Sequence, residues 1–193
     1  MIKENNPIER KVESAEKNVQ DKNKIDEQVI KLAKEAIQYK NAKMIYLIAY
    51  NFYEDLDIKT IEEMAEAIIN IGNERYIFDF ANSVPNAPIE KLGEAMSKSK
   101  DLNFIIEFAT KIKNAPIELL ADAVVESGNA NAIYKFAFYV DKAPKEKLAK
   151  AILNCGSEED CEAFAIDVMH MSLVDLIVDY AEVMTNSDED ELE

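Results

Sequence analysis

Residues 76–88 read Tyr-Ile-Phe-Asp-Phe-Ala-Asn-Ser-Val-Pro-Asn-Ala-Pro, and related stretches follow them at intervals of 28 residues. Two clear copies begin at Phe104 and Ala132, and a weaker copy begins at Asp160. A fixed period of this length is typical of tandem arrays in which each repeat is one supersecondary unit. We therefore expect the chain to be built from stacked repeats.

The spacing of apolar residues within each copy predicts helices. Ile77, Phe80, Ala81 and Val84 follow the i, i+3, i+4, i+7 pattern of one helix face. Each repeat would then hold two helices joined by a short turn. We expect first helices near 42–53, 74–84, 102–112, 130–141 and 158–169, and second helices near 59–70, 88–99, 116–127, 144–154 and 172–185.

Several positions keep their residue type from copy to copy, and these predict the core. A phenylalanine is followed by an alanine in every copy, as in Phe80 and Ala81. A ring beside a small residue is typical of close helix packing. The full set is Ile77, Ile105, Ile133, Cys161; Phe80, Phe108, Phe136, Phe164; Ala81, Ala109, Ala137, Ala165; Val84, Ile112, Val140, Val168; and Leu92, Leu120, Leu148, Leu176.

Turn and cap residues mark the helix ends. Prolines at 88, 116 and 144 stand where a second helix begins, a place that does not require the missing N–H. Thr60 and Ser172 occupy the same repeat position, and we expect them to open capping boxes with Glu63 and Asp175. Gly72, Gly128 and Gly156 follow second helices, where a left-handed turn is expected.

The repeats define the expected domain organisation. Residues 1–24 form a charged N-terminal helix or arm, either docked or free, and 186–193 form an acidic tail. Residues 25–185 form one array without an internal domain boundary. Its repeats lie near 25–40, 41–72, 73–100, 101–128, 129–156 and 157–185. The second of these holds four extra residues, which we place in the turn around 53–57.

Tandem helix pairs of this kind resemble the α-solenoid class, which includes the HEAT, armadillo and TPR-like arrays. The unit Ala-Pro-Ile-Glu-x-Leu, found at 87–92 and 115–120, is similar to short repeats of uncharacterised bacterial and phage proteins. The resemblance implies an all-α, right-handed solenoid of about 10–12 helices. It also implies an extended surface that binds other macromolecules, and it carries over no functional residue.

Charge is distributed unevenly along the chain. The formal net charge is −16, and after Lys150 there are 13 acidic residues and no lysine or arginine. Such a surface repels nucleic acid and anionic membranes and attracts basic proteins. We therefore expect no direct binding to nucleic acid or membrane and a protein partner with a basic surface. Improved solubility is the alternative role of this charge.

Catalytic and metal-binding patterns are absent from the sequence. His170 is the single histidine, and Cys155 and Cys161 are the two cysteines, so these three residues are the only candidate zinc ligands of those types. Cys161 stands at a position held by isoleucine in other repeats, which favours a core role. The sequence contains no phosphate-binding loop, HExxH or GxSxG motif. We expect no enzymatic activity, no metal and no cofactor.

Interaction residues are expected where a later copy departs from the repeat. Phe138 and Tyr139 occupy positions held by Asn82 and Ser83 in an earlier repeat, and exposed aromatics are frequent binding hot spots. Cover by a neighbouring loop is the alternative. The partner-binding candidates are Tyr50, Tyr53, Glu54, Asp55, Asp57, Phe138, Tyr139, Glu158, Glu159, Asp160, Asp167, Asp175 and Asp179.

The last helix is apolar on more than one side, whereas the final repeat of an array normally has a polar outer face. A second copy, a partner or the N-terminal helix would cover it, and the self-association candidates are Leu173, Val174, Ile177 and Val178. The sequence lacks a long apolar span and a signal-like start, which favours a cytoplasmic protein. Two functions follow: a binding protein that occupies its partner, such as a phage-type inhibitor or an acidic decoy of nucleic acid, or a self-associating scaffold.

Overall fold

A computed structural model describes residues 22, 24 and 26–179 of the chain. This part contains helices and turns but no strand, which confirms the all-α class for the residues described. The described part of the chain divides into two compact units, one ending at Pro88 and one beginning at Ile89, called here the N-terminal and C-terminal units. The predicted arm at 1–24 lies almost wholly outside the described residues, as does the tail at 186–193.

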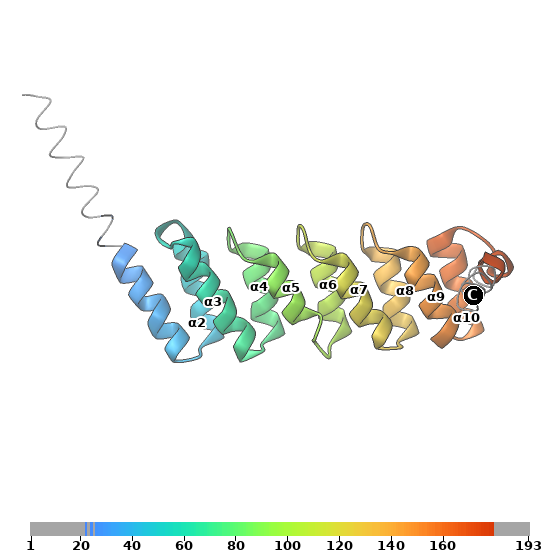
Figure 1. The fold of residues 1–193 in the computed structure, drawn as a ribbon, viewed down its shortest axis with the longest axis horizontal. Helices are drawn as coiled ribbons and strands as arrows, with labels where there is room; N and C mark the ends of the chain where they lie inside the picture. Colours follow the sequence, from blue (N-terminus) through green and yellow to red (C-terminus); the bar gives the residue numbers. More distant parts are fainter. Residues whose placement is uncertain (1–21, 23, 25, 180–193) are drawn as a thin grey trace, which may run out of the picture. The chain divides into compact units, whose positions relative to one another are not determined.

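The N-terminal unit is a group of helices (Figure 1). Helical residues 26–38 are followed by α2 (Ala42–Phe52), the 3₁₀ turn η1 (Tyr53–Asp55), α3 (Ile58–Ile71) and α4 (Glu74–Ser83). α2 packs against both α3 and α4. Side chains of Asn41, Asp57 and Asn73 accept the first free N–H groups of the three labelled α-helices, so each begins where a cap residue stands.

One predicted cap is wrong. Thr60 lies inside α3 and is 4% exposed, so it belongs to the core instead of opening the helix. The carboxylate of Asp57 accepts the backbone N–H of Thr60 at 2.6 Å and begins α3 three residues earlier. Aspartate is as good an N-cap as threonine, and the extra residues of this repeat place it in the capping position.

The C-terminal unit contains the remaining elements (Figure 1). They are α5 (Ile89–Met96), α6 (Leu102–Lys111), α7 (Ile117–Glu126), α8 (Ala130–Tyr139), α9 (Lys145–Cys155), α10 (Glu158–Phe164), the π-helical turn η2 (Ala165–Met169) and helical residues 173–179. α6 packs against α8, and α8 packs against α10 and η2. Second helices follow the same order, since α7 packs against both α5 and α9.

The repeated apolar positions form the core of both units. The four repeat phenylalanines, Phe80, Phe108, Phe136 and Phe164, are each 0% exposed. All other predicted core positions named above are buried as well. Burial of such a side chain stabilises the fold by about 1.5–3 kcal/mol, so these positions maintain the helix pairs.

The turns between first and second helices share a left-handed residue at the repeat spacing. Asn86, Asn114, Lys142 and His170 have φ values of 58°, 61°, 60° and 58°. Asparagine and histidine tolerate this conformation better than most residues, whereas lysine is strained there. The chain thus reverses direction in the same way in four successive repeats.

The glycine prediction is correct at two of three positions. Gly72 and Gly128 are left-handed, with φ of 73° and 61°. Gly156 is extended, with φ −82° and ψ 158°, so the expected left-handed turn is wrong there. The N–H of Gly156 donates to the carbonyl of Ile152 at 2.7 Å, the regular i to i−4 bond of a helix, so α9 ends without a left-handed residue.

Candidate functional site

The aromatic residues at the end of α8 form a cluster with an acid from η2. We call Tyr134, Phe138, Tyr139 and Asp167 the α8 cluster. The rings of Tyr134 and Phe138 are stacked with centroids 5.8 Å apart and planes 13° apart. Phe138 meets Tyr139 edge to face at 5.0 Å. Phe138 is 49% exposed and Tyr139 is 60% exposed, so solvent reaches both rings.

Asp167 joins the cluster through a hydrogen bond between neighbouring repeats. The hydroxyl of Tyr134 donates to Oδ2 of Asp167 at 2.8 Å. This bond to the carboxylate raises the pKa of Tyr134, with smaller contributions from burial and from the charge of Asp167. The tyrosine therefore remains a protonated donor at neutral pH, and it fixes the carboxylate beside the stacked rings.

The π turn that holds Asp167 is anchored by a lysine. Nζ of Lys145 donates to the backbone carbonyl of Val168 at 3.1 Å, in a partly buried position. The corresponding residues of the two preceding repeats are Ile89 and Ile117. A lysine at an otherwise apolar repeat position was a usable sequence signal, and neither it nor Tyr134 was among the predicted site residues.

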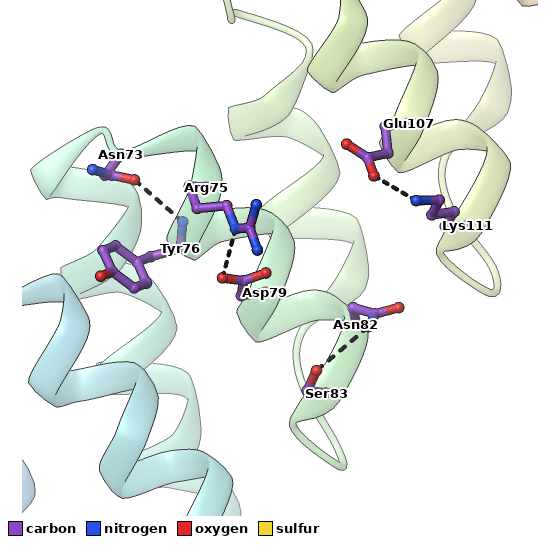
Figure 2. Close-up of polar contacts among 8 residues, drawn as sticks. All are labelled: Asn73, Arg75, Tyr76, Asp79, Asn82, Ser83, Glu107 and Lys111. Atoms are coloured by element: carbon purple, nitrogen blue, oxygen red, sulfur yellow. Dashed lines mark hydrogen bonds and ion pairs between the residues drawn. The ribbon is translucent and has the colours of Figure 1, made fainter.

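The same outward positions carry polar residues in two other first helices (Figure 2). In α4, the amide of Asn82 donates to the hydroxyl of Ser83 at 3.4 Å. In α6, Lys111 pairs with Glu107 at 2.6 Å, one helical turn away. Figure 2 also shows Arg75 paired with Asp79 at 2.9 Å and Asn73 capping α4 through the N–H of Tyr76. The exposed aromatics of α8 therefore replace self-satisfied polar side chains.

The predicted residues of the N-terminal unit lie on α2 and the turn after it. Tyr50 is exposed and stacks on Tyr46 at 5.8 Å. The hydroxyl of Tyr53 donates to Glu54 at 3.1 Å, and this bond is the main cause of a raised Tyr53 pKa. Asp55 ends η1, whereas the Asp57 carboxylate is occupied in capping α3. These acids follow one another along the turn.

The predicted acids of the C-terminal unit divide into cap residues and exposed residues. Asp160 completes a capping box with Ser157. Hydrogen bonds from the backbone N–H and the hydroxyl of Ser157 lower the pKa of the Asp160 carboxyl. The backbone N–H of Asp175 donates to the hydroxyl of Ser172 at 3.2 Å, the bond predicted for a cap, and this hydroxyl donates to the carboxylate of Asp175 at 2.6 Å. Glu158, Glu159 and Asp179 are exposed.

The predicted self-association residues lie on helical residues 173–179. Val174, Ile177 and Val178 are exposed, whereas Leu173 is half-buried and Leu176 fills the core position of the repeat. Positions i, i+3 and i+4 share one helix face, so the three exposed residues form an apolar strip. Residues 180–185 of the predicted helix lie outside the described part of the chain.

The three residues considered for zinc binding have other surroundings. The buried thiol of Cys161 donates to the carbonyl of Ile152 at 3.4 Å, and burial raises its pKa. Cys155 is exposed, and Nδ1 of His170 lies 3.2 Å from the carbonyl of Ile166. Among the described residues, no group of three or more His, Cys, Asp or Glu is placed to hold a metal ion.

Comparison with known proteins gives no match. No family model, curated protein or solved structure matches this chain. In the portion that the structure covers, no helix has both the length and the apolar character needed to span a membrane.

Proposed function

We propose that this chain is a non-enzymatic binding protein that acts by occupying a basic partner protein. The observation that carries the proposal is the exposure of Phe138 and Tyr139 at positions that are polar in earlier repeats. Buried repeat positions stay constant while these outward positions change, as expected when a scaffold is retained and one surface is adapted. Aromatic side chains are over-represented among binding hot spots.

The scaffold in this proposal is a right-handed α-solenoid of tandem two-helix repeats in the cytoplasm. Its support is the order of packing in the C-terminal unit, where first helices contact first helices and second helices contact second helices. Such arrays present long surfaces to other macromolecules.

The charge distribution supports a basic partner. Residues after Lys150 contribute 13 acids and no basic side chain. Elsewhere in the C-terminal unit, Lys147 of α9 pairs with Glu118 at 2.9 Å and with Asp122 at 2.7 Å, so these two acids already have a basic partner. The unbalanced negative charge therefore lies in the same C-terminal stretch of the sequence as η2, and such charge attracts positive surfaces.

A more specific form of the proposal is a phage-type inhibitor that takes the place of nucleic acid on a basic nuclease or defence protein. Affinity capture from the source organism, followed by mass spectrometry, tests the general form. We expect an enriched protein with a basic isoelectric point. Recovery of only acidic or neutral proteins would contradict it. For the decoy form, duplex DNA must compete with the chain for the captured protein.

Self-association is the second candidate, and it is favoured by the exposed strip of Val174, Ile177 and Val178. Two copies that bury such strips against one another would gain apolar contact area. Light scattering at tens of micromolar decides the matter. A dimer that Val174→Asp dissociates supports a scaffold role, whereas a monomer excludes it under these conditions.

A further inference from the structure

We infer that the α8 cluster is a receptor for an arginine side chain of a basic protein segment. The inference rests on the proposed function, because it names the chemistry by which a basic partner would be held. The inference goes further than the proposed function because it requires arginine in particular. Long-range attraction to acidic residues would accept lysine and arginine alike. The ligand is therefore a guanidinium group carried on an exposed peptide.

The rings provide the first half of such a receptor. A guanidinium is planar and stacks on aromatic faces, which lysine does less well. Phe138 is half exposed, lies parallel to the ring of Tyr134 and meets the ring of Tyr139 edge to face. These contacts restrict the rotamers of the ring, so little side-chain entropy remains to be lost on binding.

The carboxylate provides the second half. Arginine pairs with carboxylates through two parallel hydrogen bonds, and a carboxylate has about four acceptor positions. The bond from Tyr134 occupies one of them and orients the group. Asp167 is exposed, so its remaining acceptor positions are accessible to a ligand.

The surroundings of Asp167 favour a cation. The segment from Ser157 to His170 contains five acidic residues and no lysine or arginine, and the ammonium of Lys145, which reaches this turn from α9, donates to the backbone carbonyl of Val168. Ile166, which occupies the position of Phe138 in the next repeat, is also exposed and adds an apolar side chain next to Asp167 in the sequence.

A second pair of stacked aromatic rings, in α2, provides an internal comparison for this site. Tyr46 and Tyr50 occupy the repeat positions of Tyr134 and Phe138, and their rings are likewise stacked at 5.8 Å. The position that corresponds to Asp167 is Ser83, which carries no charge. The pair in α2 thus has the rings without the carboxylate, and it should bind arginine more weakly.

The test is a titration of the full-length, isotope-labelled protein with two peptides, followed by two-dimensional NMR at 50 and 150 mM salt. One peptide has three arginines separated by glycine and serine, and the other has lysines at the same places. We expect signals from 134–139 and 165–169 to shift. The arginine peptide should bind about fivefold more tightly than the lysine peptide, the ratio expected for about 1 kcal/mol of stacking and bidentate pairing.

Matched variants assign the effect to the site. Phe138→Ala and Asp167→Asn should each weaken binding of the arginine peptide about fivefold or more, whereas Tyr50→Ala should change it less than about twofold. Circular dichroism verifies the fold of each variant. If Phe138→Ala does not fold, Tyr139→Ala and Asp167→Asn provide the same test at exposed positions.

Equal affinity for both peptides would overturn the inference, as would equal losses in Phe138→Ala and Tyr50→Ala. The proposed function can fail separately. A captured basic protein that binds Phe138→Ala and the unsubstituted chain equally would overturn the arginine site and leave the general function standing. Conversely, arginine-selective binding at α8 without any basic protein in the capture would support the site and contradict the proposed function.

Discussion

The ammonium of Lys145 donates to the backbone carbonyl of Val168 across 23 residues of sequence, at a distance of 3.1 Å. The carbonyl lies in the π turn, where the regular pattern of helix hydrogen bonds is changed. Lysine replaces isoleucine at this repeat position, and its long side chain reaches the turn from the first residue of α9. One substitution thus supports the turn that carries Asp167.

Replacing this lysine should therefore destabilise the C-terminal unit. Lys145→Met keeps a long apolar stem and removes the donor, and we expect a loss of about 1–2 kcal/mol in the free energy of unfolding. Urea denaturation measures it. Lys150→Met in the same helix is the control, with an expected change below about 0.5 kcal/mol. Equal losses in both variants would show that the bond to Val168 contributes nothing particular.

Two phenylalanines of α8 separate the packing role of the repeat from the exposed surface. Phe136 is 0% exposed, and Phe136→Ala should cost about 3–5 kcal/mol of stability. Phe138 is half exposed, and Phe138→Ala should cost no more than about 1 kcal/mol, mainly the ring stacking with Tyr134. Chemical denaturation of both variants gives the comparison. Similar losses would mean that Phe138 is a core residue and that the exposed site is incorrectly assigned.

The cap of α3 should make stability depend on pH. Hydrogen bonds from Thr60, first from its backbone N–H, lower the pKa of Asp57 below the ordinary value of 3.8. A carboxyl with a lowered folded pKa stabilises the fold above its unfolded pKa, and this contribution is lost as pH falls through the folded pKa. Asp57→Ala should therefore cost about 1 kcal/mol at pH 7 and less in acid below pH 3.8.

Urea titrations at neutral and acid pH measure this difference. Glu62→Ala, at an exposed position of the same helix, serves as the control, with a loss below about 0.5 kcal/mol at both pH values. A penalty for Asp57→Ala that is the same at both pH values would contradict an ionised cap.

Replacing the left-handed Lys142 with glycine should increase the stability of the protein. Lys142 has a φ of 60°, which costs a residue with a side chain about 1–2 kcal/mol. Lys142→Gly removes this strain but adds freedom to the unfolded chain, so we expect a net gain of about 0.5 kcal/mol. Lys113→Gly alters a turn residue that is not left-handed, and it should lower the melting temperature. A lower melting temperature in both variants would contradict the strain.

Much of the fold follows from the repeat itself. The Phe80 and Leu92 columns were predicted as core from repetition and helical spacing, and the structure buries them. Repetition fails where a local competitor exists. At Thr60 the preceding Asp57 is an equally good cap, and it begins α3 three residues earlier.

The candidate site was predictable only in part. Phe138 and Tyr139 differ in chemical type from the polar residues of earlier repeats, so comparison within the chain identifies them. The hydrogen bond between Tyr134 and Asp167 spans 33 residues and depends on the π turn. The 28-residue period of the sequence does not predict this turn. Asp167 was predicted for its charge alone. Its partner Tyr134 was missed because an aromatic residue within a predicted helix is expected to pack against neighbouring helices.

The dependence of partner affinity on salt tests the proposed binding to a basic protein most directly. The partner is the protein enriched by affinity capture, purified and titrated into the full chain by calorimetry. Because the screening length falls from about 30 Å at 0.01 M to about 10 Å at 0.1 M salt, attraction between exposed charges weakens steeply. We expect the affinity to fall about tenfold or more between 50 and 300 mM salt. An affinity that stays constant over this range would contradict a function based on the acidic surface.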